Sequence, residues 1–380
     1  MVLRIVLIMI FGYMTIINLT RPVITLFAIE LGASVFEIGI LTAAFAFFPL
    51  IFAIHAGKIA DKIGDRLPVL LGFIGLTISM AIPYFFHTMW ALYLSQIIVG
   101  IANIFLVVSL QNVLGNASTP ENRDHYFSWF GMATALGVLV GPIIGGYISE
   151  HFSYADAFLV SVFISIFTML FSFKIPVIIK ENNTVKAGLL SSIGLLKMPL
   201  LRSALFSSAL VLYSRDIFVA YFPLYAKQYD ISDSAIGWII AVQGLAMLFI
   251  RFALPKITTL LGRDKVLSIS IIVAGIAFFL IPFTGNILLL GLYSCLMGFG
   301  LGCGQPLSMS TTYSASPKSR TGEVLGLRVS TNRLSQLIAP LFFGLIGIWM
   351  GVISVFLISG IFLLGGTYFL GLKNLNEEQS

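Results

Sequence analysis

The sequence predicts an all-α membrane protein in which twelve transmembrane helices form two pseudo-symmetric six-helix bundles. Three observations predict this fold: the composition, a series of long apolar runs, and an internal repeat. Of the 380 residues, 58% are hydrophobic and only 10% are charged, and the mean hydropathy is +1.01. Soluble domains keep about a quarter of their residues charged, because their surface faces water. A chain this apolar therefore requires an apolar solvent.

The apolar runs are each long enough to cross a bilayer, which takes roughly 20 residues of helix. They are expected to be helices, because only helices and closed barrels satisfy the backbone in lipid and barrel strands are much shorter. The first run resembles a secretory signal, but no small-residue cleavage site follows it, so we expect it to be the first span. The predicted spans are 5–28, 36–56, 68–86, 90–113, 126–149, 156–176, 201–226, 234–254, 266–284, 287–313, 324–348 and 351–371.

The basic residues predict how the chain is oriented in the membrane. With the N-terminus in the cytoplasm, sixteen Lys and Arg residues outside the spans fall on the inner side and only Lys227 falls on the outer side. Cytoplasmic loops of membrane proteins carry such an excess of Lys and Arg. We therefore expect a multi-pass protein of the plasma (inner) membrane with both termini in the cytoplasm. The net charge of +6 is then explained by topology, without nucleic acid as a partner.

The two halves of the chain repeat weakly at an offset of 197–200 residues. Six short matches occur in the same order in both halves, and Gly64 with Gly262 is one of them. Several ordered matches at one offset indicate a duplicated unit. The predicted domains are an N-terminal bundle at 1–176, a cytoplasmic linker at 177–200 and a C-terminal bundle at 201–380. Many secondary transporters are built from such repeats, with the substrate site between them near the midplane.

The loop after the second predicted span carries the pattern G-x-x-x-D-[RK]-x-G-x-[RK]. Its residues are Gly57, Asp61, Lys62, Gly64 and Arg66. This pattern resembles the cytoplasmic signature of the major facilitator superfamily, and the resemblance extends over the whole chain, since span number, repeat and loop lengths agree. It implies that Asp61 caps the N-terminus of the eleventh span, where the helix dipole favours an anion, and so holds the outward-facing state. Gly64 is expected to form a tight turn. The alternative is a solvated charged loop.

The fifth predicted span carries the pattern G-x-x-x-G-P-x-x-G-G. Its residues are Gly137, Gly141, Pro142, Gly145 and Gly146. The pattern is similar to the antiporter signature of the same family, found mainly in its drug:proton antiporters. Its small residues are expected to form a groove for another helix, although such packing can also be unrelated to the direction of transport. Two departures stand out: Ser128 replaces a further glycine of this signature, and Gln96 replaces an arginine that another family motif links to proton coupling.

Polar residues deep in the spans are candidates for the transport path, because a charge at the helix centre costs roughly 2.5–3.5 kcal/mol. Asp216 is an acid in the middle of a span, and the repeat relates it to Asn18. Arg21 lies about one helical turn from that level and is the expected partner of Asp216, in a working or a structural ion pair. The candidate substrate and proton pathway comprises Asn18, Arg21, Arg215, Asp216, Gln243, Gln305, Asn332 and Arg333.

Other polar residues have competing interpretations. Arg251 and Arg328 lie near cytoplasmic span ends and are expected to extend toward the headgroups. Asn103, like the amides of the pathway, could either line a cavity or bond one helix to another.

These observations predict a secondary active transporter, not an enzyme: a proton-coupled antiporter that exports a small organic solute by alternating access. The sequence has no phosphate-binding loop, zinc motif or nucleophile elbow, so we expect no cofactor and no metal. An organic-anion carrier of the same family is the alternative, because Arg21, Arg215 and Arg333 outnumber Asp216. A non-transporting membrane receptor is the alternative from another class. The expected partners are the solute, protons and the lipid bilayer, and we expect a monomer.

Overall fold

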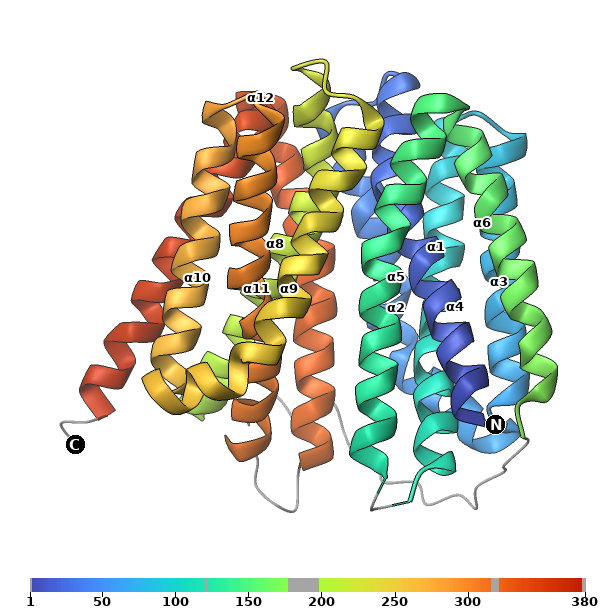
Figure 1. Cartoon of the computed structure of the whole chain (residues 1–380), viewed down its shortest axis with the longest axis horizontal. Coiled ribbons are helices and arrows are strands. Elements are labelled where there is room, and N and C mark those ends of the chain that lie inside the picture. Colours follow the sequence, from blue (N-terminus) through green and yellow to red (C-terminus); the bar gives the residue numbers. More distant parts are fainter. Residues whose placement is uncertain (1, 120–121, 177–197, 316–320, 378–380) are drawn as a thin grey trace. The chain divides into compact units, whose positions relative to one another are not determined.

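The computed structural model describes residues 2–119, 122–176, 198–315 and 321–377 (Figure 1). Residues 177–197, which make up most of the predicted linker, lie outside the described part of the chain. For some helical residues only the backbone is described, namely 52–63, 123–124, 199–200, 313–315, 321–323, 325–326 and 368–377.

Eleven long helices account for most of the described residues. Two short 3₁₀ segments, Leu170–Lys174 and Ile281–Phe283, continue α6 and α10. The helices are α1 Val2–Glu30, α2 Val35–Ile63, α3 Arg66–Phe85, α4 Met89–Ala117, α5 Arg123–His151, α6 Tyr154–Met169, α8 Pro199–Lys227, α9 Asp233–Leu261, α10 Arg263–Leu280, α11 Ile287–Ala315 and α12 Thr321–Glu377.

The longest helix, α12, consists of two helices joined at Gly351. The backbone of Gly351 has φ 78° and ψ 169°, which is not helical, and glycine adopts positive φ without the steric cost that a Cβ would impose. The break falls at the first residue of the predicted span 351–371, directly after the predicted span 324–348. With α12 divided there, the described residues form twelve helices, which confirms the predicted all-α fold of twelve spans.

Most of these helices have the length and composition of membrane spans. Ten stretches among the described residues qualify, with Leu327–Thr367 of α12 counted once, and Val35–Ile51 of α2 is a shorter apolar stretch. Several helices extend beyond the predicted spans, as α4 does at its C-terminal end. The difference arises because apolar residues mark the part of a helix inside the hydrocarbon, whereas the helix continues into the interface.

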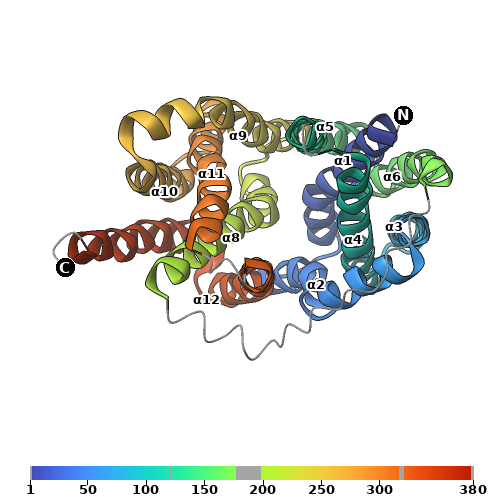
Figure 2. The same ribbon diagram turned by 90° about the horizontal axis from the view of Figure 1, so that it is seen from below.

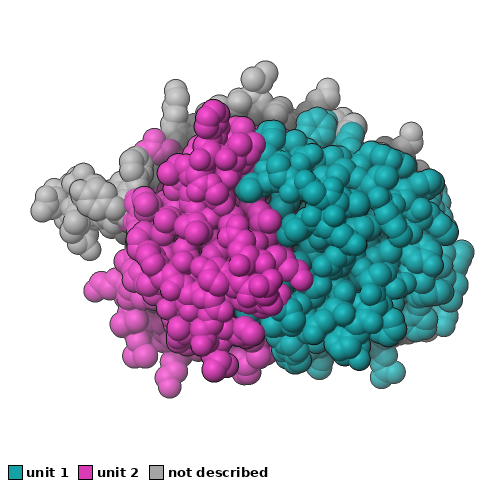
Figure 3. All heavy atoms as spheres, turned by 90° about the horizontal axis from the view of Figure 1, so that it is seen from above, with its two compact units in different colours: residues 1–184, 232–241 teal, residues 185–231, 242–380 magenta. Residues whose placement is uncertain are grey.

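Contacts divide the chain into two compact units (Figure 3). Unit 1 comprises residues 1–184 and 232–241, and unit 2 comprises residues 185–231 and 242–380. The first turns of α9 therefore belong to unit 1, whereas the rest of this helix belongs to unit 2.

Within unit 1, helix α1 packs against α4, α5 and α6 (Figure 2). Its side chains Ile10, Ile16 and Leu19 are fully buried. In contrast, α6 exposes Phe163 and Phe167. A surface of exposed aromatic side chains is unfavourable in water but suits a lipid-facing helix.

Helix α8 has the corresponding place in unit 2, where it packs against α11 and α12. Its aromatic side chains supply both packing and hydrogen bonds. The Tyr221 hydroxyl donates to the carbonyl of Pro340 at 2.8 Å, and the Tyr225 hydroxyl donates to the carbonyl of Thr284 at 2.8 Å. Buried carbonyls without a partner are costly, so these bonds help to fix α8 against its neighbours.

The turns after α2 and α9 show the repeat in the backbone itself. Gly64 has φ 79° and ψ 161°, and Gly262 has φ 82° and ψ 153°. Gly64 follows the last residue of α2, and Gly262 lies between the last residue of α9 and the first residue of α10. The turn at Gly64 was expected from the sequence. A residue with a Cβ would be strained in either turn.

Candidate functional site

A buried polar cluster joins α8 to α12 within unit 2. Asp216 of α8 is 5% exposed and Gln336 of α12 is 7% exposed. The Gln336 Nε2 group donates to Asp216 Oδ2 at 2.6 Å, and Gln336 Oε1 accepts from an Nη1 hydrogen of Arg333 at 3.0 Å. Gln336 therefore bonds to a carboxylate and a guanidinium at once. We call Asp216, Arg333 and Gln336 the acidic cluster, after the buried carboxylate of Asp216.

The chemistry of glutamine explains its position between two charges. A buried charge is costly unless hydrogen bonds compensate it, and an amide offers both donors and an acceptor. Gln336 can thus supply a hydrogen-bond partner to each of the two charged groups. The sequence interpretation missed Gln336. The signal that could have found it is the spacing of Arg328, Asn332 and Gln336, which recur every fourth residue and so share one helix face.

A second polar cluster connects α8, α11 and α12. The Arg328 Nη2 group donates to Gln305 Oε1 at 2.8 Å, and Gln305 Nε2 donates to the carbonyl of Ser208 at 3.0 Å. The Ser208 hydroxyl donates to Asn332 Oδ1 at 2.9 Å. We call Ser208, Gln305, Arg328 and Asn332 the basic cluster. From the sequence, Arg328 was expected to extend toward the headgroups. Instead, its guanidinium bonds to Gln305 of α11.

The two clusters lie at different depths on the same two helices. Ser208 and Asp216 are eight residues apart on α8, as are Arg328 and Gln336 on α12. At 1.5 Å per helical residue, each separation amounts to about 12 Å along the helix axis. Unit 2 therefore contains two polar levels, one with Asp216 and Arg333 and the other with Arg328.

The pathway candidates on α1 lie in unit 1. The Asn18 Nδ2 group donates to the carbonyl of Met14 at 2.7 Å, within the same helix. The guanidinium carbon of Arg21 lies 4.8 Å from the centre of the Phe45 ring, a cation–π distance. Because Asp216 belongs to unit 2, the pairing of Arg21 with Asp216 remains a prediction.

The remaining polar candidates have different environments. Gln243 of α9 is 2% exposed, and its Nε2 group has no hydrogen-bond partner among the described residues. Arg215, next to Asp216, is partly exposed. Asn103 accepts a hydrogen bond from the Tyr13 hydroxyl, so it bonds α4 to α1. Of the two interpretations for Asn103, the structure favours the helix-to-helix bond.

The glycines of α5 bring this helix close to α1. A Cβ built at Gly137 would lie 2.6 Å from Met14 Cβ, and one at Gly141 would lie 2.7 Å from the carbonyl oxygen of Thr15. At Gly145 it would lie 2.6 Å from the carbonyl oxygen of Leu19. These distances leave no room for a side chain, so three turns of α5 form a groove that holds α1.

The last glycine of the pattern faces another helix. A Cβ at Gly146 would overlap the carbonyl oxygen of Asp233, and a Cβ at Gly237 would overlap the carbonyl oxygen of Pro142. The backbone N–H of Ser234 also donates to the Glu150 carboxylate at 2.7 Å. The end of α5 and the first turns of α9, all within unit 1, are thus joined by backbone packing and by an acidic group at a helix N-terminus.

Part of the glycine and aspartate pattern between α2 and α3 falls on residues whose side chains are not described. Gly57, Asp61 and Lys62 lie on α2 in that stretch. Arg66 begins α3, and its guanidinium carbon lies 5.9 Å from the centre of the Phe173 ring.

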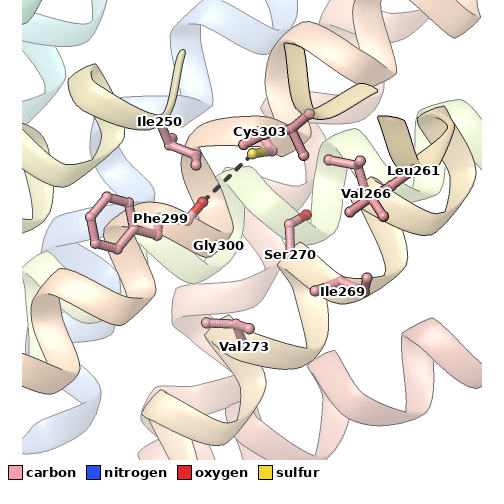
Figure 4. Close-up of a pocket in the computed structure, with 10 residues that line it drawn as sticks. Ile250, Leu261, Val266, Ile269, Ser270, Val273, Phe299, Gly300 and Cys303 are labelled. Atoms are coloured by element: carbon pink, nitrogen blue, oxygen red, sulfur yellow. Dashed lines mark hydrogen bonds between the residues drawn. The ribbon is translucent and has the colours of Figure 1, made fainter. Parts of the chain in front are cut away.

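Two apolar cavities also lie within unit 2. One, of about 190 Å³, is lined by α9, α10 and α11 (Figure 4), and the other, of about 420 Å³, is lined by α8 and α12. In the first, the Cys303 thiol points to the carbonyl of Phe299 at 3.7 Å. Neither lining contains a charged side chain. Among the described residues, no group of His, Cys, Asp and Glu could hold a metal ion.

Comparisons with known proteins agree with this architecture. The sequence profile of the Major Facilitator Superfamily matches residues 6–230 and 204–379. An uncharacterised MFS-type transporter of Methanocaldococcus jannaschii is 22% identical over 352 residues, covering 91% of each chain. The class B tetracycline resistance protein of Escherichia coli is 27% identical over 318 residues, covering 81% of this chain and 78% of that protein. The crystal structure of the nucleoside transporter NupG has a TM-score of 0.80 at 15% identity and covers 98% of each chain, so it shares the fold.

Proposed function

Because this chain belongs to the Major Facilitator Superfamily, we propose that it is a proton-coupled antiporter that exports a small organic solute by alternating access. The family consists of transporters, so the chain is a multi-pass membrane transporter and not an enzyme. The observation that carries the finer proposal is Asp216, a buried acid in the middle of α8. An ionisable group inside a membrane span is costly, and such groups mark ion and proton pathways in transporters.

Two further features support export. The class B tetracycline resistance protein of Escherichia coli is similar over most of the chain. The glycines of α5 form the close packing expected of the antiporter-like pattern. We therefore take tetracycline as the first solute to test. In this proposal the two six-helix halves, 1–176 and 201–380, alternate around the solute, and Asp61 holds one of the two states.

The direct test is transport by the purified protein in proteoliposomes. With the lumen made acidic, outward proton flow is expected to drive tetracycline into the lumen against its own gradient. Collapse of the proton gradient with an ionophore should abolish this accumulation. If the protein only equilibrates tetracycline, with or without a proton gradient, it is not a proton-coupled antiporter for this solute.

The organic-anion carrier remains a second candidate, because Arg21, Arg215 and Arg333 outnumber Asp216 among the pathway residues. The proteoliposome assay distinguishes it from the antiporter. An anion carrier would exchange an external organic anion for an internal one without a proton gradient.

Both termini are expected to lie in the cytoplasm of a plasma-membrane protein, in which the chain acts as a monomer. Alkaline phosphatase is active only in the periplasm, so a fusion to the C-terminus should be inactive in Escherichia coli. A matched fusion after Tyr229, in the turn between α8 and α9, should be active, because this turn is expected to face outward. An active C-terminal fusion would show that the number or the orientation of the spans is wrong.

A further inference from the structure

We propose that the basic cluster, through Arg328 and Asn332, binds an anionic group of the transported solute. The proposal rests on the proposed function in one respect, that α8, α11 and α12 line the transport path. It adds the class of solute and the residues that recognise it. In the expected topology, this site lies toward the cytoplasmic side, because α12 begins there.

The hydrogen bonds of the cluster leave donors available but no unused side-chain amide acceptor. Gln305 Oε1 accepts from Arg328, and Asn332 Oδ1 accepts from Ser208. Gln305 Nε2 is used as well, by the carbonyl of Ser208. In contrast, the Arg328 Nη1 group and the Asn332 Nδ2 group donate to no acceptor among the described residues. A ligand at this cluster therefore meets N–H groups, which favour an anion or a carbonyl oxygen.

The charge of Arg328 is not neutralised by any acid among the described side chains. Its guanidinium bonds only to Gln305, through the side-chain and main-chain oxygens, and its buried Nε group has no partner in the described part of the chain. Arg328 lies two turns from the start of α12, and its partner Gln305 is a neutral amide. Placing a cation inside a membrane span without a countercharge has a free-energy cost. An anionic ligand would supply the missing countercharge.

The geometry holds the free donors in place. Arg328 and Asn332 are four residues apart on α12, so they lie on the same face of the helix. Gln305 fixes the guanidinium from α11, and Ser208 fixes the Asn332 amide from α8. Both Arg328 and Asn332 are partly exposed. Donors that are already oriented lose little freedom on binding, which favours affinity.

A pair of probes that differ in one charge tests the proposal. The dissociation constants of 2-naphthoate and 2-naphthamide are measured by naphthyl fluorescence with the purified, detergent-solubilised chain. The variants are Arg328→Gln, Arg328→Lys and the control Arg251→Gln. Arg251 is a cation in the same unit, but its side chain is exposed and donates only to the carbonyl of Gly302 among the described residues.

The wild-type protein is expected to bind naphthoate more tightly than naphthamide. Arg328→Gln should weaken naphthoate binding by roughly 10- to 100-fold, as for the loss of a charge-assisted bond, and naphthamide binding by about twofold or less. Arg328→Lys should retain part of the preference, because it keeps the charge but loses the fixed fork of donors. Arg251→Gln should leave both affinities unchanged.

Three results would overturn the proposal: equal affinity of the wild-type protein for both probes, an equal loss for both probes in Arg328→Gln, or the same selective loss in Arg251→Gln. Size-exclusion chromatography confirms that each variant is folded. The assay contains no membrane and no proton gradient. A failure of proton coupling or of export would therefore leave the binding result unaffected, and a failure of anion binding would leave the proteoliposome result unaffected.

Discussion

Asp216→Asn is expected to abolish proton-driven accumulation of tetracycline but to preserve exchange of labelled for unlabelled tetracycline. Asparagine has nearly the same shape as aspartate, and its oxygen can still accept the hydrogen bond from Gln336. It cannot bind and release a proton in the range in which a carboxylate does so. Exchange of solute for solute moves no net proton, so it does not depend on that step.

The measurement uses proteoliposomes with an imposed proton gradient, and the same preparations without a gradient for the exchange assay. Asp264→Asn is the matched control, because Asp264 is an exposed acid in the first turn of α10. It should accumulate tetracycline like the wild-type protein. Suppose instead that Asp216→Asn concentrates tetracycline with the wild-type dependence on pH. Asp216 would then be a structural acid, and the carrier would be coupled through other groups or not at all.

The twelve helices could be predicted because each depends on residues that are close together in sequence. Apolar runs locate the spans, and the glycine of the loop pattern predicts the turn at Gly64, where the structure has a positive φ. Even the division of α12 at Gly351 was predictable, from two adjacent runs that together exceed the thickness of a bilayer.

The acidic and basic clusters could be predicted only in part. Asp216, Gln305, Asn332 and Arg333 were candidates, since polar residues in spans need a reason to be there. Which of them meet depends on how α8, α11 and α12 pack, and helical periodicity gives only the face of each helix. For this reason, the bond from Gln336 to Asp216 and the bond from Arg328 to Gln305 were not predicted. Arg328 is the clearest example. Its position near the end of a span predicts that the side chain extends toward the headgroups, whereas in the structure Gln305 of α11 binds its guanidinium.

The contact between α5 and the first turns of α9 leads to the second large expected effect. Gly146→Leu should reduce transport severalfold or more. The Cβ would overlap the Asp233 carbonyl oxygen, which belongs to a helix backbone and cannot rotate away as a side chain could. Overpacking of this kind typically costs about 1–3 kcal/mol. In a two-state carrier, such a cost shifts the equilibrium ratio of the two states by a factor of roughly 5 to 150, away from the state that contains the contact.

Gly131→Leu is the control on the same helix, because a Cβ at Gly131 meets nothing within 4 Å. It should transport normally, whereas Gly146→Leu should remain folded but favour the state in which α5 and α9 have separated. A cysteine at Ala241, a residue of α9 in unit 1 that is 1% exposed, is expected to report this separation through a membrane-impermeant thiol reagent added outside cells. Cys295 and Cys303 are replaced by serine. Labelling should rise in Gly146→Leu and stay at the background level in Gly131→Leu. Normal transport by Gly146→Leu, or an equal loss in Gly131→Leu, would mean that the contact does not distinguish the states of the transport cycle. The Glu150 carboxylate at the N-terminus of α9 would then serve only to stabilise the helix.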